Sequence, residues 1–189
     1  WASETDKVNG MVQENVIAQL NNIKTVSFGG SMTLEETGML TALRHDPSIH
    51  LIDRSTAKTP DETKKMYHDA LSSDVYFMST NAITTGGELV NIDGTGNRVA
   101  ALIYGPETVV ILAGMNKIAA NVDEALSRVH NVATAQNCIR LDKKTPCAIT
   151  GACADCLSPD CICNQVVITR RSGIKGRIKV LLIGESFGY

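Results

Sequence analysis

Residues 24–43, KTVSFGGSMTLEETGMLTAL, decide the fold class because they predict a strand, a glycine turn and a helix in direct succession. Residues 24–28 are a short apolar segment that predicts a strand, and they run straight into Gly29, Gly30 and Ser31. Residues 32–43 then predict a helix. A strand, a turn and a helix in this order form the first unit of an α/β fold.

The same alternation continues along the rest of the chain. Further strands are predicted at residues 51–52, 74–78, 108–112, 165–169 and 177–183. Further helices are predicted at residues 3–20, 60–71, 99–104 and 122–134. This order predicts an α/β three-layer sandwich with a mainly parallel sheet and helices on both faces. The last two strands are expected to form a C-terminal antiparallel edge hairpin.

Length and composition restrict the possible classes of protein. The 189 residues, 43% of them hydrophobic, suit a single domain over residues 1–189. With 18 Lys and Arg against 20 Asp and Glu, the net charge of −2 argues against nucleic-acid and membrane partners. No apolar run reaches the roughly 18–20 residues of a membrane span, and no secretory segment is visible, so a soluble cytoplasmic chain is expected. Because residue 1 is Trp, we expect that residues originally preceded it.

The first candidate site is the glycine turn after the opening strand. There, backbone N–H groups at the start of a helix could face an anion, with hydroxyl groups beside them. The predicted ligand-binding residues are Gly29, Gly30, Ser31 and Thr33. The alternative is structural, because glycine permits close strand–helix packing and Ser31 would be the N-cap of the helix. No lysine of a nucleotide-triphosphate loop follows, so a carboxylate or phosphate is the expected ligand.

The second candidate site is the polar segment 81–98, which is predicted to fold as a small hairpin or excursion after a strand. Open α/β sheets place ligands at such strand ends. The predicted ligand-binding residues are Asn81, Asn91, Gly94, Gly96, Asn97 and Arg98, and Asp93 is a candidate for proton transfer. A dinucleotide fingerprint is excluded because Val99 stands where the third glycine would be. The alternative is that the glycines only form turns.

The six cysteines are concentrated near the C-terminal part of the chain, five of them between Cys147 and Cys163. This clustering indicates a local site in a reducing compartment rather than a secreted disulfide scaffold. Residues 142–164 are predicted to be a cysteine-rich loop insertion that lies apart from the cleft. The expected cofactor is zinc or an iron–sulfur cluster, with Cys147, Cys153, Cys156 and Cys163 as metal ligands. A dithiol switch and plain free thiols are the alternatives.

Nearly the whole chain resembles the LUD domain family of lactate utilization proteins, in its short single-domain form. The resemblance rests on GGSMTLEETG at residues 29–38, the long block 79–106, the segment 114–118 and the loop from Thr145 to Asn164. It implies a fold similar to ribose-5-phosphate isomerase and the CoA transferases, with ligands at the strand ends. It also implies a role in oxidation of lactate to pyruvate beside iron–sulfur partner subunits. The family's long form carries its ferredoxin-like cysteines in a separate C-terminal part, so the loop of this chain is not equated with them.

Two functions follow from these observations. In the first, the chain binds a small carboxylate or phosphorylated metabolite, Arg98 pairs with a second acidic group, and Asp93 or Glu35 transfers a proton. In the second, the chain is a non-catalytic partner subunit of an iron–sulfur electron-transfer assembly, with a metal in its cysteine loop. The sequence leaves open whether the chain catalyses turnover and whether it forms a homodimer.

Overall fold

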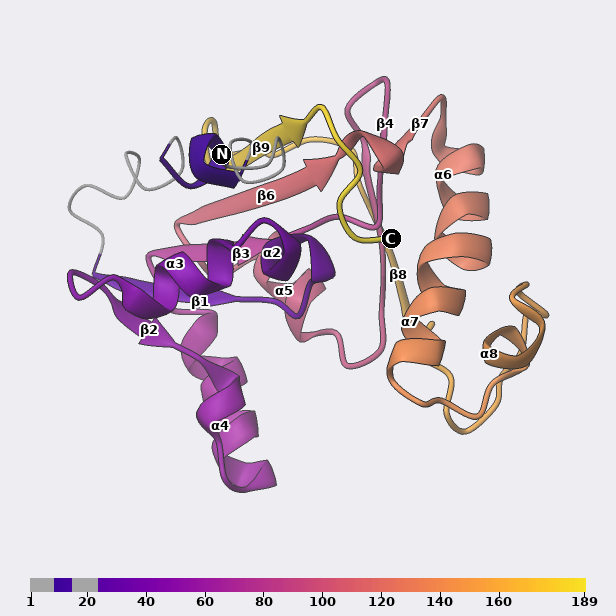
Figure 1. Ribbon diagram of the computed structural model, residues 1–189, viewed down its shortest axis with the longest axis horizontal. Coiled ribbons are helices and arrows are strands. Elements are labelled where there is room, and N and C mark those ends of the chain that lie inside the picture. Colours follow the sequence, from indigo (N-terminus) through magenta and orange to yellow (C-terminus); the bar gives the residue numbers. More distant parts are fainter. Residues whose placement is uncertain (1–8, 15–23) are drawn as a thin grey trace, which may run out of the picture.

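The computed structural model of the chain describes residues 9–14 and 24–189 (Figure 1). Residues 9–14 are helical, and the rest of the helix predicted at 3–20 lies outside the described residues. No helix in the described part is long and apolar enough to cross a membrane.

The main sheet has five strands in the order β2-β1-β3-β6-β9, and all four pairings are parallel. The strands are β1 (Thr25–Phe28), β2 (His50–Ile52), β3 (Val75–Met78), β6 (Thr108–Gly114) and β9 (Ile178–Ile183). The central strand β3 is buried along its whole length, as expected for a parallel strand covered on both faces. The predicted mainly parallel sheet is therefore confirmed.

The second sheet is smaller and mixed, in the order β7-β4-β5-β8. Its strands are β4 (Ala82–Thr84), β5 (Leu89–Asp93), β7 (Ile118–Ala119) and β8 (Gln165–Thr169). Strands β4 and β5 form the small hairpin predicted within residues 81–97, and β8 pairs antiparallel with β5.

The predicted C-terminal edge hairpin is wrong. Strand β8 belongs to the small sheet, whereas β9 pairs in parallel with β6 in the main sheet. Residues 170–177 carry the chain from one sheet to the other. Each of the two strands pairs with a strand much earlier in the chain, β9 with β6 over six positions and β8 with β5 over five.

Two hydrophobic cores cover the two faces of the main sheet. Side chains alternate along β3, so Val75 and Phe77 pack in one core and Tyr76 and Met78 in the other. The first core is closed by α2 (Met32–Glu36) and α3 (Met39–His45). The second is closed by α4 (Pro60–Ala70), α5 (Asn97–Ile103) and the β4–β5 hairpin. This arrangement confirms the predicted three-layer sandwich, and in Figure 1 α2 and α3 lie over the strands of the main sheet while α4 extends away from them.

Two predicted helices have different boundaries in the structure. The helix predicted at 32–43 is divided into α2 and α3 because Gly38 has a φ of 67°, a left-handed conformation that favours glycine. The helix predicted at 122–134 is longer, since α6 (Val122–Arg128) continues through a π-helical segment (Val129–Thr134) into α7 (Ala135–Arg140). This long helix packs on the small sheet through Ala125 and Val129.

Short helices occupy three connections. Arg54–Thr56 and Met115–Lys117 are 3₁₀ turns, and α8 (Pro146–Thr150) lies within the segment predicted as a cysteine-rich loop. Helix α8 begins with proline at its first turn, where the missing N–H costs nothing, and it ends at Gly151 with a φ of 75°.

Candidate functional site

The carboxyl ends of the central parallel strands meet at one edge of the main sheet. After β1 the chain moves to β2 on one side, whereas β3 and β6 lie on the other side, so the strand order reverses beside β1. Such a reversal opens a crevice at the carboxyl ends of the strands. Gly29, Ser79 and Met115 are the residues that directly follow β1, β3 and β6 at this edge.

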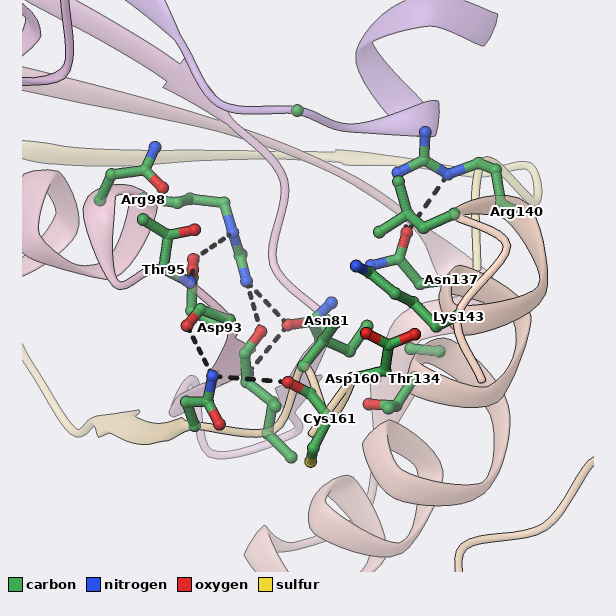
Figure 2. A pocket seen from close by; sticks show the side chains of 18 of the residues that line it. Asn81, Asp93, Thr95, Arg98, Thr134, Asn137, Arg140, Lys143, Asp160 and Cys161 are labelled. Atoms are coloured by element: carbon green, nitrogen blue, oxygen red, sulfur yellow. Dashed lines mark hydrogen bonds and ion pairs between the residues drawn. The ribbon is translucent and has the colours of Figure 1, made fainter. Parts of the chain in front are cut away.

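Two connected hollows lie at this edge, one of about 500 Å³ and one of about 80 Å³. Both are lined by Gly30, Asn81, Arg98 and Arg140, so they form one cleft. Figure 2 shows Arg98 and Asp93 on one side of the larger hollow and Asn137, Arg140 and Lys143 on the opposite side. The first side comes from the β5–α5 segment and the second from α7 and the residues after it.

The guanidinium of Arg98 is held by protein groups at every nitrogen. Its Nε donates to Asp93 Oδ2 at 3.2 Å, and its Nη1 donates to Ser79 O and Asn91 Oδ1. Its Nη2 donates to Asn81 Oδ1 and Ile92 O. A guanidinium has five N–H donors, so this set uses all of them. Arg98 therefore has no donor left for the second acidic group that the sequence predicted it would bind.

Both carboxylate oxygens of Asp93 are also occupied by hydrogen bonds within the protein. Its Oδ1 accepts hydrogen bonds from the backbone N–H groups of Thr95 and Gly96, at 3.1 and 2.8 Å, and its Oδ2 accepts from Arg98. The side chain is 9% exposed. These contacts make Asp93 the anchor of the 93–96 turn, which includes the left-handed Gly96, and the partner of Arg98. Its predicted role in proton transfer remains a prediction.

The glycine turn after β1 is divided between structural and cleft-facing residues. Gly29 donates its N–H to Phe77 O, and a Cβ atom there would lie 3.1 Å from Arg98 Cδ, so its role is close packing. Gly30 and Ser31 line the cleft, and Ser31 Oγ also caps α2 by accepting from Leu34 N. Thr33 is buried and donates its hydroxyl to Phe187 O.

Not every predicted residue lies in the cleft. Among the described residues that line the two hollows, Asn81, Asp93, Gly94, Asn97 and Arg98 are present. Asn91 and Gly96 lie just behind this lining, Asn91 through its bond to Arg98. Glu35 is exposed on α2, on the side of Arg44, and does not line the cleft in the part of the chain that is described. The structure therefore gives Glu35 no position from which to transfer a proton to a ligand there.

Lys117 lines the cleft but was not among the residues predicted from the sequence. Its pKa differs strongly from that of an ordinary lysine. It ends the 3₁₀ turn after β6, is 3% exposed, and its Nζ lies 2.9 Å from Thr33 Oγ1 and 3.0 Å from Ser79 Oγ. Burial, and then the charges of Arg128 and Arg98, lower its pKa to about 7.

Three further cationic side chains line the larger hollow. Arg54 follows β2 and stacks on Tyr67, with 5.6 Å from its Cζ to the ring centroid. Arg140 and Lys143 come from α7 and the residues after it, and Arg140 donates to Asn137 Oδ1. Arg54 and Lys117 each follow a strand of the main sheet, so the strand-end argument used for residues 29–33 could have found them.

The cysteine-rich segment lies beside the cleft, contrary to the prediction that it lies apart from it. Asp160, Cys161 and Asn164 line the larger hollow (Figure 2). The segment is brought there because Asn164 donates its side-chain N–H to Gly94 O and its backbone N–H to Asp93 O. A Cβ atom on Gly94 would lie 3.5 Å from the Cα of Ile162, so this glycine allows the close approach.

The four cysteines predicted as metal ligands do not come together as a set, although burial and then the neighbouring thiols Cys147 and Cys161 raise the pKa of Cys138. All six are free thiols, and among the described residues no group of three His, Cys, Asp or Glu side chains is arranged to hold a metal ion. Cys138 and Cys147 are buried together, whereas Cys153 lies against His130, with 3.5 Å between Sγ and Nδ1. Burial raises the pKa of Cys163 to about 12. Zinc or an iron–sulfur cluster on Cys147, Cys153, Cys156 and Cys163 stays a prediction.

The fold and the cleft together define a class: a three-layer α/β protein whose cleft lies at the carboxyl ends of parallel strands and is rich in cationic side chains. Comparison with known families is more specific. The LUD domain profile matches residues 1–183, so the chain belongs to the LUD domain family. No curated protein gave a significant match.

Solved structures with a similar arrangement include three chains at low identity. The delta subunit of eIF2B from Chaetomium thermophilum is 19% identical, with 62% of this chain and 50% of that chain covered and a TM-score of 0.38. Ribose 5 phosphate isomerase A from Neisseria gonorrhoeae is 12% identical over 65% and 57%, also at 0.38. A DUF162 family protein from Deinococcus radiodurans is 12% identical over 97% and 100%, at 0.38. The chain thus spans about half of the first relative, and scores this low carry no argument about function.

Proposed function

We propose that the cleft binds a small metabolite that carries a carboxylate or phosphate group, with lactate and pyruvate as the first candidates. One observation carries the proposal. Four cationic side chains but only two carboxylates, Asp93 and Asp160, line the two hollows within the described residues, although the whole chain has a net charge of −2. The cations are Arg54, Arg98, Arg140 and Lys143.

The availability of these cations supports an anionic ligand. Arg98 is neutralised by Asp93, whereas the Arg54 guanidinium has no hydrogen-bond partner among the described residues and faces the larger hollow. Arg140 bonds the neutral amide of Asn137, which leaves its charge uncompensated. A concave site with uncompensated cationic charge attracts anions and holds them by charge-assisted hydrogen bonds. Membership in the LUD family, which is associated with lactate utilization, makes short carboxylates the first ligands to test.

Calorimetric titration with lactate, pyruvate and a sugar phosphate tests this function. Removal of one charge in the cleft, by Arg54→Gln or Arg140→Gln, is expected to weaken binding by at least about tenfold, because a hydrogen bond to a charged group contributes about 1.5–3 kcal/mol. Lys179→Gln is the matched control, since Lys179 is exposed on β9 away from the lining residues. Absence of binding by all three ligands, or an equal loss in the control, would contradict the proposal.

The role of a non-catalytic partner subunit in an iron–sulfur assembly remains the second candidate. It needs a metal in the cysteine-rich segment, and that segment reaches the cleft through Cys161 and Asn164. Metal analysis of the purified protein separates the two candidates.

A further inference from the structure

The strongest unexplained feature of the cleft is the hydrogen bonding of Lys117. Its Nζ contacts two hydroxyl groups, Thr33 Oγ1 at 2.9 Å and Ser79 Oγ at 3.0 Å. Each hydroxyl has a single hydrogen, and each already donates it to a carbonyl group: Thr33 to Phe187 O at 3.1 Å, and Ser79 to Thr80 O at 3.2 Å. Both hydroxyls therefore accept a hydrogen from the lysine.

This arrangement satisfies a neutral amine in full, whereas the third N–H of an ammonium would have no acceptor among the described residues. A neutral lysine has two N–H hydrogens, and the two hydroxyls accept both of them. The remaining tetrahedral position on Nζ then holds the lone pair. Lys117 lines the smaller hollow, together with Gly30, Ser31 and Tyr189. A lone pair on a lysine that borders a hollow is available to a molecule bound there.

The charges around Lys117 also favour the neutral amine. Among the described residues it forms no ion pair with a carboxylate. Arg128 on α6 and Arg98 on α5 act against its protonation, and the one opposing carboxylate, Glu36 on α2, is the weakest influence. Arg140 and Tyr189 also border the same hollow. Burial and neighbouring cations are the two means by which proteins keep a lysine unprotonated and nucleophilic.

We propose that Lys117 is a nucleophile that condenses with the carbonyl group of a small 2-oxo acid held in the smaller hollow. This inference rests on the proposed anion-binding function, because the carboxylate of the acid needs the cationic cleft. Arg140, which lines both hollows, is the cation best placed to hold that carboxylate. The smaller hollow, of about 80 Å³, has room for a few heavy atoms beside Nζ, and a longer ligand would extend into the larger hollow.

The chemical step is balanced without an oxidant or a reductant. The lone pair of Nζ attacks the carbonyl carbon, and the carbon–oxygen π electrons move to oxygen, giving a carbinolamine after proton transfer from nitrogen to oxygen. The hydroxyl group then takes a proton and leaves as water while a carbon–nitrogen double bond forms. The product is an imine between Lys117 and the 2-oxo acid, whose carboxylate is unchanged.

Reductive trapping tests the proposal directly. The full chain is incubated with pyruvate and sodium cyanoborohydride, digested, and mapped by mass spectrometry. We expect one dominant modified lysine, Lys117, whose mass gain equals pyruvic acid less one oxygen atom. Lys117→Met should lose this adduct, and Lys179→Met, which removes an exposed lysine of β9 away from the cleft, should retain it. Mapping of the adduct on the wild-type chain tests the proposal even if Lys117→Met fails to fold.

The pH dependence separates a nucleophile from a merely accessible lysine. The rate of adduct formation at Lys117 should rise through a midpoint of about pH 7 and then level. An ordinary lysine, with a pKa of about 10.4, would continue to gain rate far above that pH.

Lactate has a hydroxyl group in place of the carbonyl and cannot form the imine. Titration with lactate therefore tests anion binding by the cleft separately from the nucleophilic role of Lys117. Lactate binding without an adduct from pyruvate overturns the nucleophile and leaves the anion site standing. No lactate binding and no adduct overturn both. Adducts spread over exposed lysines overturn the nucleophile, and an adduct confined to Lys117 without lactate binding supports it and counts against a general anion site.

Discussion

Each side of the cleft buries one basic side chain, and the hydrogen-bond partners of the two side chains differ. On the side of the small sheet, Arg98 has Asp93 as its partner and donates all five N–H groups to protein oxygens. On the side of the main sheet, Lys117 contacts only two hydroxyl groups and no carboxylate within the described residues. The comparison indicates that Arg98 builds the cleft and that Lys117 is available to what binds in it.

Replacement of Arg98 should have the largest effect. Arg98→Met leaves the buried carboxylate of Asp93 and several oxygens without their donor, and the loss of one partner of a buried ion pair costs roughly 3–5 kcal/mol. Urea unfolding measures the free energy of unfolding. Arg171→Met is the control, because Arg171 is exposed and should change stability by at most about 0.5 kcal/mol. Equal losses in the two variants would show that Arg98 does not hold the cleft together.

The lowered pKa of Lys117 should make the free energy of unfolding depend on pH. Its pKa is about 7 in the folded chain and 10.5 as the ordinary value, so between these pH values the unfolded chain binds more protons. The free energy of unfolding should therefore rise with pH across this window, by at most about 1.4 kcal/mol per pH unit, because the cost of burying the charge disappears.

The measurement compares urea unfolding of the wild type and Lys117→Met from pH 6 to pH 9 in steps. The difference between the two should increase in favour of the wild type as pH rises, whereas Lys143→Met should run parallel to the wild type. A constant difference between wild type and Lys117→Met would mean that Lys117 stays protonated, which would make the two sides of the cleft alike.

A smaller effect is expected from Gly30→Ala. A Cβ atom at Gly30 would lie 2.5 Å from Arg54 Nη2, so the guanidinium must move away from its place at the cleft. Because only the flexible end of a side chain is displaced, stability should change little, while anion binding measured by calorimetry should weaken several-fold. Gly173→Ala, which meets open space, is the matched control. Unchanged binding in Gly30→Ala would show that Arg54 does not contribute to anion binding.

Loss of a metal from the cysteine-rich segment is expected to affect the cleft least. If Cys147, Cys153, Cys156 and Cys163 bind a metal, anaerobically purified protein should contain near-stoichiometric zinc, or iron with a brown absorbance, and Cys153→Ser should lose it. Alkylation before and after chelation gives the control, because Cys161 should react equally in both. A metal-free protein with unprotected thiols would contradict the metal prediction and the partner-subunit role that depends on it.

Much of the fold was predictable because it depends on local order. The alternation of apolar strands and amphipathic helices predicted the parallel sheet and both helical layers. The C-terminal hairpin was wrong because strand partners are chosen by long-range packing: β8 and β9 are neighbours in sequence, yet each pairs with a strand far earlier in the chain. Proximity in sequence favours hairpins but does not decide the partner.

The site was predictable where it follows strand ends. That rule located Gly30, Ser31 and Asn81, and applied evenly it would also have found Arg54 and Lys117. Asn137 and Arg140 could not have been found in this way, because their position depends on the π-helical segment that continues α6 beyond its predicted end and on its packing against the small sheet. The hydrogen bonds that occupy Arg98 likewise require knowledge of tertiary structure.

The bonds of Arg98 have a consequence for how the cleft recognises molecules. They join Ser79, which follows a strand of the main sheet, to Asn91 and Ile92 of the small sheet, so one guanidinium ties the two sheets together across the floor of the cleft. Widening the cleft would break several of these bonds at once. The conformational entropy of ordering these groups is therefore lost during folding rather than during binding, so a ligand meets a cleft whose two sides are already joined.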